Sequence, residues 1–335
     1  MRVSVIGCGS WGTAWAFLLG RNGACVQVWD GDRRVLDGIA RDRRNPLYLA
    51  DTALPETVRV CPDVEGCVSG ADIVLIAVPA QAVREVCSRG RDALLSTSAT
   101  LVSASKGLET DTGARMSEVI REVLGEAVRQ RLVALSGPNL AVEMCRLMPA
   151  ATVVAGAVPS RLAAAQAALS APTLRVYTCP DIAGVELGGA LKNVVAVAAG
   201  MTDGLGFGDN TKASLITRGL AEMTRLGIAL GARAETFVGL SGVGDLVATC
   251  SSRTSRNWRV GHALAQGRSL QEACRDLGMV AEGPPTARAV LRLSHQTGVE
   301  MPISAQVHAV LFEGRTVPEA AEALMSRPLR DERVG

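Results

Sequence analysis

Three glycines near the start of the chain lie at one bend between two apolar runs. Gly7, Gly9 and Gly12 form a G-x-G-x-x-G pattern between a β-branched run, residues 2–6, and a helical pattern, residues 10–23. In such a bend the first glycine makes a tight turn, the second lets a pyrophosphate approach the backbone, and the third lets helix and strand pack closely. The start of the helix then offers unpaired N–H groups to the phosphates. The pattern predicts a dinucleotide-binding site, and the alternative is a purely structural turn.

Charged residues at the end of the next apolar run indicate which dinucleotide is bound. Asp30 lies 18 residues after Gly12 (30 − 12), where a carboxylate can accept hydrogen bonds from the ribose hydroxyls of NAD. Arg33 and Arg34 follow closely, and guanidinium groups suit the 2′-phosphate of NADP. The two signals conflict. Because Asp30 is nearer the strand end, we expect NAD to be mildly favoured over NADP.

A lysine in the second half of the chain has an unusual setting. Lys192 and Asn193 interrupt a stretch of small and apolar residues, 187–201, and no charged residue is closer to Lys192 than Glu186. A lysine that only covers a surface usually has charged neighbours. Two interpretations remain open at this point, a functional ammonium group and a lysine that extends its charge to water.

Two further segments place polar groups at strand ends. Lys106 follows an apolar strand, at the edge where doubly wound sheets bind ligands, but a solvated lysine at a turn is the simpler interpretation. The SGPN turn, residues 136–139, lies at a similar edge. Asn139 could contact a ligand there, or could be the N-cap of a helix that continues through Glu143.

A polar run downstream carries an arginine beside an asparagine. Asp245 is followed by Ser255, Arg256 and Asn257. Such a pair suits a phosphate oxyanion, although these residues could equally close the end of a helix.

The elements that must position these side chains fall into two groups. Apolar strand patterns end at about residues 6, 30, 79, 106, 138 and 156, with helical patterns between them, among them one continuous helix over residues 81–95. Buried strands that alternate with helices predict a doubly wound, mostly parallel sheet. From residue 184 onward the pattern is helical throughout. We therefore expect an α/β protein with a Rossmann-like dinucleotide-binding domain over residues 1–180 and an all-helical substrate-binding and catalytic domain over residues 181–335.

Composition and charge exclude several classes of partner. Of the 335 residues, 48% are hydrophobic and 20% charged, and the net charge is +2, so neither nucleic acid nor a membrane surface is indicated. The nine cysteines are scattered with no C-x-x-C pair, which favours a reducing, cytoplasmic setting and no structural metal site. We expect no signal peptide, and the apolar stretch of residues 187–201 is shorter than the ~20 residues of a membrane span.

Eight segments together resemble one enzyme family, over nearly the full length of the chain. They are VIGCGSWGTA, NPLYL, ASKGLET, SGPN, GGALKNVVA, GDNTKASLITRGLAEM, GVGDLVATC and SRN. The chain resembles the NAD(P)-dependent glycerol-3-phosphate dehydrogenases of the bacterial type. The resemblance implies reversible NAD(P)H-dependent reduction of dihydroxyacetone phosphate to sn-glycerol 3-phosphate, which supplies glycerophospholipid synthesis.

The resemblance also implies a role for individual residues, with Lys192 as the proton donor and acceptor. Residues that would bind the substrate are Lys106, Gly137, Asn139, Lys192, Asp245, Ser255, Arg256 and Asn257. Further residues would contact the cofactor, and the glycine motif and the charges after it add to them. Together they are Gly7, Gly9, Ser10, Trp11, Gly12, Asp30, Arg33, Arg34, Lys106, Arg256, Val280 and Glu282.

The chain departs from the family pattern at three places. Asn139 stands where the bacterial pattern usually has Ser or Thr, VAEGPP replaces the usual V-V-E-G-V, and the basic or histidine residue that commonly follows the second strand is delayed by Asp30, Gly31 and Asp32. Two other functions remain possible from the sequence. One is a related dehydrogenase acting on a hydroxy acid or sugar acid, and the other is a non-catalytic dinucleotide-sensing module. A homodimer through the second domain is plausible.

Overall fold

The chain folds into two compact units, which are described separately. The computed structural model describes residues 1–329 and 331–332. Unit 1 contains Met1–Ser105 and Met116–Val185, and unit 2 contains Lys106–Arg115 and Glu186–Gly335. The short segment Lys106–Arg115 therefore belongs with the helical second half of the chain, although the sequence places it inside the α/β half. The boundary lies five residues beyond the expected one, at 185 rather than 180.

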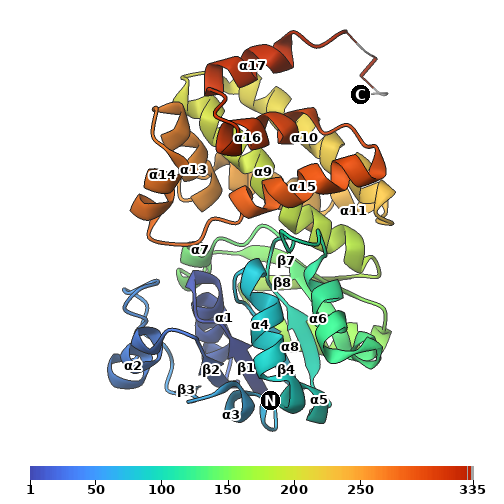
Figure 1. Ribbon diagram of the computed structural model, residues 1–335. Helices are drawn as coiled ribbons and strands as arrows, with labels where there is room; N and C mark the ends of the chain where they lie inside the picture. The colour runs from blue at the N-terminus through green and yellow to red at the C-terminus, as the bar shows by residue number, and fades with distance from the viewer. Residues whose placement is uncertain (330, 333–335) are drawn as a thin grey trace. The chain divides into compact units, whose positions relative to one another are not determined.

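An eight-stranded sheet forms the centre of unit 1 (Figure 1), in the order β3-β2-β1-β4-β5-β6-β7-β8. Neighbouring strands are parallel except β6 and β7, which are antiparallel. The strands are β1 (Arg2–Ile6), β2 (Cys25–Trp29), β3 (Val58–Val60), β4 (Ile73–Ile76), β5 (Thr100–Ser103), β6 (Leu132–Ser136), β7 (Ala150–Gly156) and β8 (Leu174–Cys179). The mostly parallel, doubly wound sheet predicted from the sequence is confirmed. Two strands were not predicted from the sequence: β3, because three residues are too few to show a period, and β8, which corresponds to none of the six predicted strand ends.

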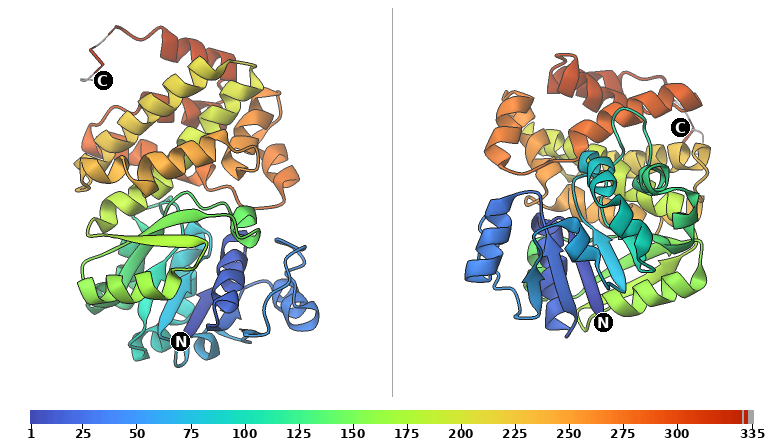
Figure 2. Two further views of the ribbon diagram at one scale, coloured as in Figure 1. Left: turned by 180° about the vertical axis from the view of Figure 1, so that it is seen from behind. Right: turned by 60° about the horizontal axis from the view of Figure 1, so that its bottom comes forward.

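Helices cover both faces of this sheet. In Figure 1, α4 lies in front of the strands, and in the view from behind α8 does so (Figure 2, left). The helices are α1 (Ser10–Arg21), α2 (Arg33–Asp42), α3 (Val64–Val68), α4 (Val83–Arg89), α5 (Arg91–Ser96), α6 (Met116–Leu124), α7 (Ala141–Cys145) and α8 (Pro159–Leu169). The single helix expected over residues 81–95 is wrong. It breaks at Gly90, where the chain passes Val64 so closely that a β-carbon would lie 2.4 Å from Val64 Cγ1.

From Glu186 onward the described residues of unit 2 form helices joined by turns, whereas its segment Lys106–Arg115 is a turn closed by an isolated bridge between Leu108 and Arg115. Its helices are α9 (Ile182–Gly204, which starts four residues before the unit), α10 (Asp209–Ala229), α11 (Ala234–Phe237), α12 (Asp245–Ser251), α13 (Arg256–Ala265), α14 (Leu270–Leu277), α15 (Gly283–Thr297), α16 (Pro302–Phe312) and α17 (Val317–Met325). A short irregular turn, η3 (Leu240–Gly244), leads into α12.

The central helix α9 passes among the other helices of the unit (Figure 1). At 23 residues it is longer than the sequence pattern indicated, and among the described residues it is the one helix long and apolar enough to cross a membrane. However, 89% of its most apolar window is buried in the protein, as in a core helix. It crosses α13 through glycines: a β-carbon on Gly200 would lie 1.9 Å from the Trp258 carbonyl oxygen. Any larger residue there would force the two helices apart.

Candidate active site

The glycine bend of unit 1 has three different local geometries. Gly7 has φ +96°, a conformation that favours glycine, and its N–H donates to the Trp29 carbonyl at 2.8 Å. A β-carbon on Gly12 would lie 1.8 Å from the Gly7 carbonyl oxygen, so α1 packs against the bend through Gly12. A β-carbon on Gly9, in contrast, would meet no atom within 4 Å. Gly9 therefore borders open space at the N-terminus of α1, where a pyrophosphate would fit.

Side chains from two other segments brace this bend. Asp30 accepts from the Cys8 N–H at 2.6 Å and from the Asp32 N–H at 2.8 Å, which ties the bend to the end of β2. Asn45, fully buried, donates to the Cys8 carbonyl at 2.7 Å and to Thr13 Oγ1 at 2.8 Å. Sequence analysis missed Asn45 as a residue of the site. The only signal was the turn-forming Asn-Pro dipeptide at the start of NPLYL.

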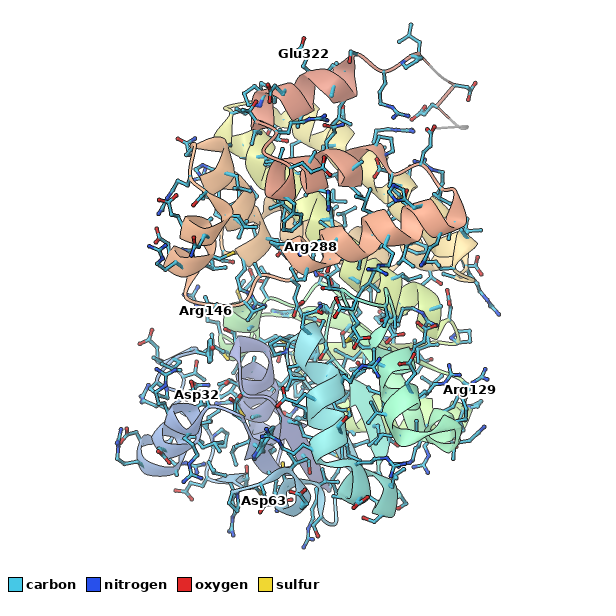
Figure 3. The ribbon with its side chains drawn as sticks, in the orientation of Figure 1. Asp32, Asp63, Arg129, Arg146, Arg288 and Glu322 are labelled. Carbon is cyan, nitrogen blue, oxygen red and sulfur yellow. The ribbon has the colours of Figure 1, made fainter. Side chains whose placement is uncertain are left out.

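The charges beyond Asp30 are arranged at the start of α2. Asp32 caps this helix by accepting from the Arg34 N–H at 2.9 Å and also pairs with the Arg34 guanidinium at 2.6 Å. Figure 3 labels Asp32 at this helix start. Arg33 is exposed. Arg34 is thus committed to Asp32, which weakens the case for it as a 2′-phosphate ligand.

Ser10 and Trp11 form the first turn of α1. The Trp11 indole N–H donates to the Ala104 carbonyl at 3.1 Å, and its ring packs edge-on against Trp15. This bond joins the glycine bend to the chain just before Lys106.

The SGPN turn places Gly137 and Asn139 beside β7. Gly137 has φ +148°, and a β-carbon there would lie 2.9 Å from Thr152 Cα. Asn139 donates to the Ala151 carbonyl at 3.0 Å, and its buried Oδ1 has no hydrogen-bond partner among the described residues. The alternative of Asn139 as a helix N-cap is wrong, because Leu140 precedes α7 and no side chain caps that helix.

A buried cluster of two lysines and one aspartate lies inside unit 2. Lys192 Nζ lies 2.8 Å from Asp245 Oδ1, and Lys106 Nζ lies 2.8 Å from Asp245 Oδ2. Lys192 also donates to Thr249 Oγ1 at 2.6 Å. The side chains of Lys106, Lys192 and Asp245 are 16%, 8% and 3% exposed, so Lys192 does not extend to water as a surface lysine would. Two ammonium groups share one carboxylate, which leaves the cluster with one net positive charge.

Three separate parts of the chain supply the cluster. Asp245 begins α12, and Thr249 follows one turn later, so both face the same side of that helix and Thr249 Oγ1 lies 3.2 Å from Asp245 Oδ1. Lys192 comes from the middle of α9, and Lys106 comes from the segment that unit 2 takes from the first half of the chain. The resemblance implied that Asp245 binds substrate, whereas the structure gives it both lysines as partners.

Burial and charge shift the pKa values within this cluster. Burial lowers the pKa of Lys106 to about 8; Asp245 opposes this shift, and Lys192 adds to it. Burial alone would raise the pKa of Asp245, but the two ammonium groups outweigh it and hold the pKa below the usual value.

A chain of amide hydrogen bonds surrounds the lysines. Asn193 donates to the Lys106 carbonyl at 3.2 Å, Asn257 donates to Asn193 Oδ1 at 2.8 Å, and the Gly283 N–H donates to Asn257 Oδ1 at 2.9 Å. These bonds connect α9, α13 and α15 beside the cluster. Asn257 therefore has both of its amide atoms engaged within the protein, and Asn193 is a further site residue to which sequence analysis gave no role.

The remaining predicted residues of unit 2 gather at the start of α13 and α15. Ser255 is the N-cap of α13 and accepts from the Trp258 N–H at 3.3 Å, as in the helix-end alternative. The Arg256 guanidinium donates to the Val280 carbonyl at 2.7 Å, and the Val280 side chain is 48% exposed. Glu282 directly precedes α15. The described residues contain no group of three or more His, Cys, Asp or Glu side chains that could hold a metal ion.

Comparisons with known proteins agree along both halves of the chain. Residues 2–161 match the family model of the NAD-dependent glycerol-3-phosphate dehydrogenase N-terminus, and residues 181–322 match that of the C-terminus of the same family. The chain belongs to the NAD-dependent glycerol-3-phosphate dehydrogenase family. The resemblance stated from the eight segments is therefore confirmed.

Individual relatives of this family cover nearly the whole chain. A glycerol-3-phosphate dehydrogenase [NAD(P)+] of Nitratidesulfovibrio vulgaris Hildenborough is 47% identical over 332 residues, 99% of this chain and 100% of the relative. One of Geobacter sulfurreducens is 46% identical, with 99% of each chain covered. The crystal structure of glycerol-3-phosphate dehydrogenase (gpsA) from Coxiella burnetii has a TM-score of 0.92 at 35% identity, covering 97% of this chain and 99% of the other. A D-mandelate dehydrogenase structure, only 12% identical with a TM-score of 0.61, shares the fold alone.

In this member of the glycerol-3-phosphate dehydrogenase family, each unit brings together its own set of predicted residues. Unit 1 holds those of the glycine bend, the end of β2 and the SGPN turn: Gly7, Gly9, Ser10, Trp11, Gly12, Asp30, Arg33, Arg34, Gly137 and Asn139. Unit 2 holds the remainder: Lys106, Lys192, Asp245, Ser255, Arg256, Asn257, Val280 and Glu282. Chemically, the first set can cradle a dinucleotide, and the second offers a buried ammonium with net positive charge around it.

Proposed function

We propose that the protein catalyses reversible NAD(P)H-dependent reduction of dihydroxyacetone phosphate to sn-glycerol 3-phosphate. The observation that carries the proposal is the buried Lys106–Asp245–Lys192 cluster, because reduction of a ketone needs a proton donor beside a developing oxyanion. The open space beside Gly9 supports a dinucleotide as the partner in the reaction. When bound, the nicotinamide supplies a hydride to the ketone carbon.

Lys192 is the proposed proton donor in the reducing direction and acceptor in the oxidising one. Its Nζ is held from two sides, by Asp245 Oδ1 at 2.8 Å and Thr249 Oγ1 at 2.6 Å, which fixes where the proton is delivered. Asp245 does not neutralise the site, because the same carboxylate also pairs with Lys106. The remaining positive charge stabilises the negative charge that builds on the ketone oxygen.

The phosphate end of the substrate is assigned to the start of α13. Ser255 and Arg256 lie there, and an arginine can bind a phosphate through two parallel hydrogen bonds. Asn257 contributes by bracing this turn against Asn193 rather than by contacting phosphate, since its amide atoms are engaged. Gly137 and Asn139 are kept as substrate contacts from unit 1, and the unpartnered Oδ1 of Asn139 supports this assignment.

For the coenzyme, we infer a modest preference for NADH over NADPH. The Asp30 carboxylate at the end of β2 accepts hydrogen bonds from the bend itself, which holds its negative charge where a 2′-phosphate would approach. Val280 and Glu282 are assigned to the nicotinamide end. All nine cysteines lie in the described part of the chain and are free thiols, which supports a cytoplasmic enzyme that supplies glycerophospholipid synthesis. A homodimer through unit 2 stays a prediction.

One assay distinguishes this function from the two alternatives, a related dehydrogenase and a dinucleotide-sensing module. Oxidation of NADH and of NADPH is followed with dihydroxyacetone phosphate, with unphosphorylated dihydroxyacetone, and with a panel of 2-oxo acids and sugar acids. We expect turnover with the phosphorylated ketone alone, and a higher kcat/KM with NADH. Turnover confined to the acids would establish the related dehydrogenase instead, and coenzyme binding without turnover on any substrate would establish a sensing module.

A further inference from the structure

A charged cavity of about 290 Å³ lies in unit 2, between α13 and α14. Its lining contains three arginines, Arg253, Arg259 and Arg268, and a single carboxylate, Asp276. Arg268 pairs with Asp276, whereas the guanidinium groups of Arg253 and Arg259 have no hydrogen bond or ion pair to any described residue. The cavity therefore carries a surplus of two positive charges (3 − 1), on guanidinium groups that are not committed elsewhere.

The floor of this cavity is rigid and apolar. The Trp258 ring stacks on the His262 ring with centroids 4.8 Å apart, and the Trp258 indole N–H donates to Asp203 at 2.7 Å. Ala273 and Leu277 of α14 complete the floor from the other side. Arg253, Arg259 and Arg268 are exposed beside this floor, so their guanidinium groups are accessible to an anion from solvent.

The cavity is separate from the proposed active site. Trp258, Arg259 and His262 share one face of α13, while Asn257, which contacts Asn193 and Gly283, points roughly to the opposite face at 3.6 residues per turn. None of Lys106, Lys192, Asp245 or Arg256 lines the cavity. An anion bound here would not occupy the place of the substrate.

We propose that this cavity is a binding site for a small multivalent organic anion, a phosphate or a polycarboxylate. The two uncommitted guanidiniums set the charge of the ligand, because each can bind a phosphate or carboxylate group bidentately. The volume, near the lower end for small-molecule sites, restricts the ligand to the size of pyrophosphate or citrate.

Calorimetric titration of the NADH-saturated protein tests the proposal, with pyrophosphate in one arm and citrate in the other. NADH keeps the probes out of the dinucleotide site. We expect at least one probe to bind the wild type, and the R253A/R259A double variant to bind it at least fivefold more weakly. The matched control is Arg275→Ala, which removes an exposed arginine from α14 that does not line the cavity, and its affinity should change less than twofold.

The two arms identify the anionic group of the ligand, because a site for phosphate binds pyrophosphate and a site for carboxylates binds citrate. Thermal unfolding of each variant checks that the fold is retained. The proposal is overturned if neither probe binds the wild type at 5 mM, if the double variant binds as tightly as the wild type, or if Arg275→Ala weakens binding as much as the double variant does. The last result would mean that overall charge alone attracts the anion.

Discussion

At the scale of single residues, the proposed chemistry depends on how one carboxylate is divided between two ammonium groups. Asp245 lies at hydrogen-bonding distance from both Lys106 and Lys192 and is almost fully buried. A buried pair of equal and opposite charges would be neutral, but three charges leave a net positive site for an anionic substrate. We therefore expect substitution of Lys192 to affect turnover and the titration of Lys106 to affect substrate binding.

Lys192→Ala should abolish turnover while leaving the coenzyme bound. We expect kcat to fall by about 10²–10⁴-fold, the usual contribution of a positioned proton donor, and the Kd for NADH to change less than about twofold. Steady-state kinetics and coenzyme titration measure the two quantities. The control is Lys212→Ala on α10, where the lysine pairs with Asp203 rather than with Asp245, and kcat should stay within about threefold. A Lys192→Ala enzyme with more than a tenth of wild-type turnover would contradict the assigned role.

Lys106 should make substrate binding depend on pH near 8. Burial lowers its pKa to about 8, so the ammonium is mostly charged at pH 7 and loses its proton as pH rises through that value. Because the neutral amine attracts a phosphorylated ketone less, KM should increase between pH 7 and pH 9.5. In Lys106→Arg the charge persists over this range, and KM should be flat. The same rise in KM in the Lys106→Arg enzyme would show that another group titrates.

At the scale of elements, turns and helix ends decide which residue types a position tolerates. The glycine bend contains one glycine required by backbone conformation, one required by helix packing and one that borders open space. In unit 2, the N-terminus of α16 is capped by the buried carboxylate of Glu222 from α10.

Substitution at Gly9 and at Gly12 should separate coenzyme binding from stability. Gly9→Ala meets no atom within 4 Å, so the fold should be unaffected, but the added methyl group fills the space for the pyrophosphate and should raise the Kd for NADH at least tenfold. Gly12→Ala would place a β-carbon 1.8 Å from the Gly7 carbonyl oxygen, and the free energy of unfolding should fall by about 2 kcal/mol or more. Denaturant unfolding and NADH titration measure both. Unchanged coenzyme affinity in Gly9→Ala would show that the pyrophosphate does not bind at this bend.

Glu222 should make the stability of unit 2 depend on pH. The side chain is 3% exposed and accepts from the Ile303 and Ser304 N–H groups in the first turn of α16, and burial raises its pKa to about 7. Since the unfolded chain has a pKa near 4.3, the folded state holds more protons between these values. This contribution to stability is complete below pH ~4 and disappears as pH rises through about 7.

The measurement is the slope of unfolding free energy against pH in wild type and in Glu222→Gln, which cannot titrate. The difference in free energy between wild type and Glu222→Gln should shrink as pH rises from 4.5 to 7. Glu322→Gln on α17, at an exposed carboxylate (labelled in Figure 3), should keep the wild-type slope. Equal slopes in wild type and Glu222→Gln would show that Glu222 binds protons equally in the folded and unfolded states, so that its pKa is not raised by folding.

At the scale of the whole molecule, the two units are not consecutive pieces of sequence. Unit 2 includes Lys106–Arg115, and this segment brings two cations to it. One is Lys106. The other is Arg115, whose guanidinium lies 2.9 Å from Glu186 on α9, with side chains 14% and 6% exposed.

Removing Arg115 should therefore destabilise the protein by more than a surface arginine does. Arg115→Ala leaves Glu186 with a buried negative charge, and breaking such a pair costs about 3 kcal/mol. Arg129→Ala, at an exposed arginine of unit 1, should change the free energy of unfolding by less than about 0.5 kcal/mol. Urea unfolding of both variants provides the comparison. A small, equal change in the two would mean that the segment contributes little to unit 2.

Much of the fold was predictable because it depends on local patterns. Runs of β-branched residues and helical periodicity identified the mostly parallel sheet and the helical second half, and the spacing of Gly7, Gly9 and Gly12 located the bend between β1 and α1. The break at Gly90 and the short strand β3 were not predictable, because both arise from contacts with distant segments such as Val64 and β2.

The amino-acid sequence by itself determined the family, the two-part architecture and the unusual setting of Lys192, but not whether that lysine is buried. Only the tertiary structure decided what surrounds that lysine. Asp245, Thr249 and Lys106 are separated from it by 53, 57 and 86 residues (245 − 192, 249 − 192 and 192 − 106), and no periodicity relates positions that far apart. These groups need charged or hydrogen-bonding partners, because an unpaired charge in a low-dielectric interior costs too much free energy. Which partner is available depends on the folded path of the whole chain.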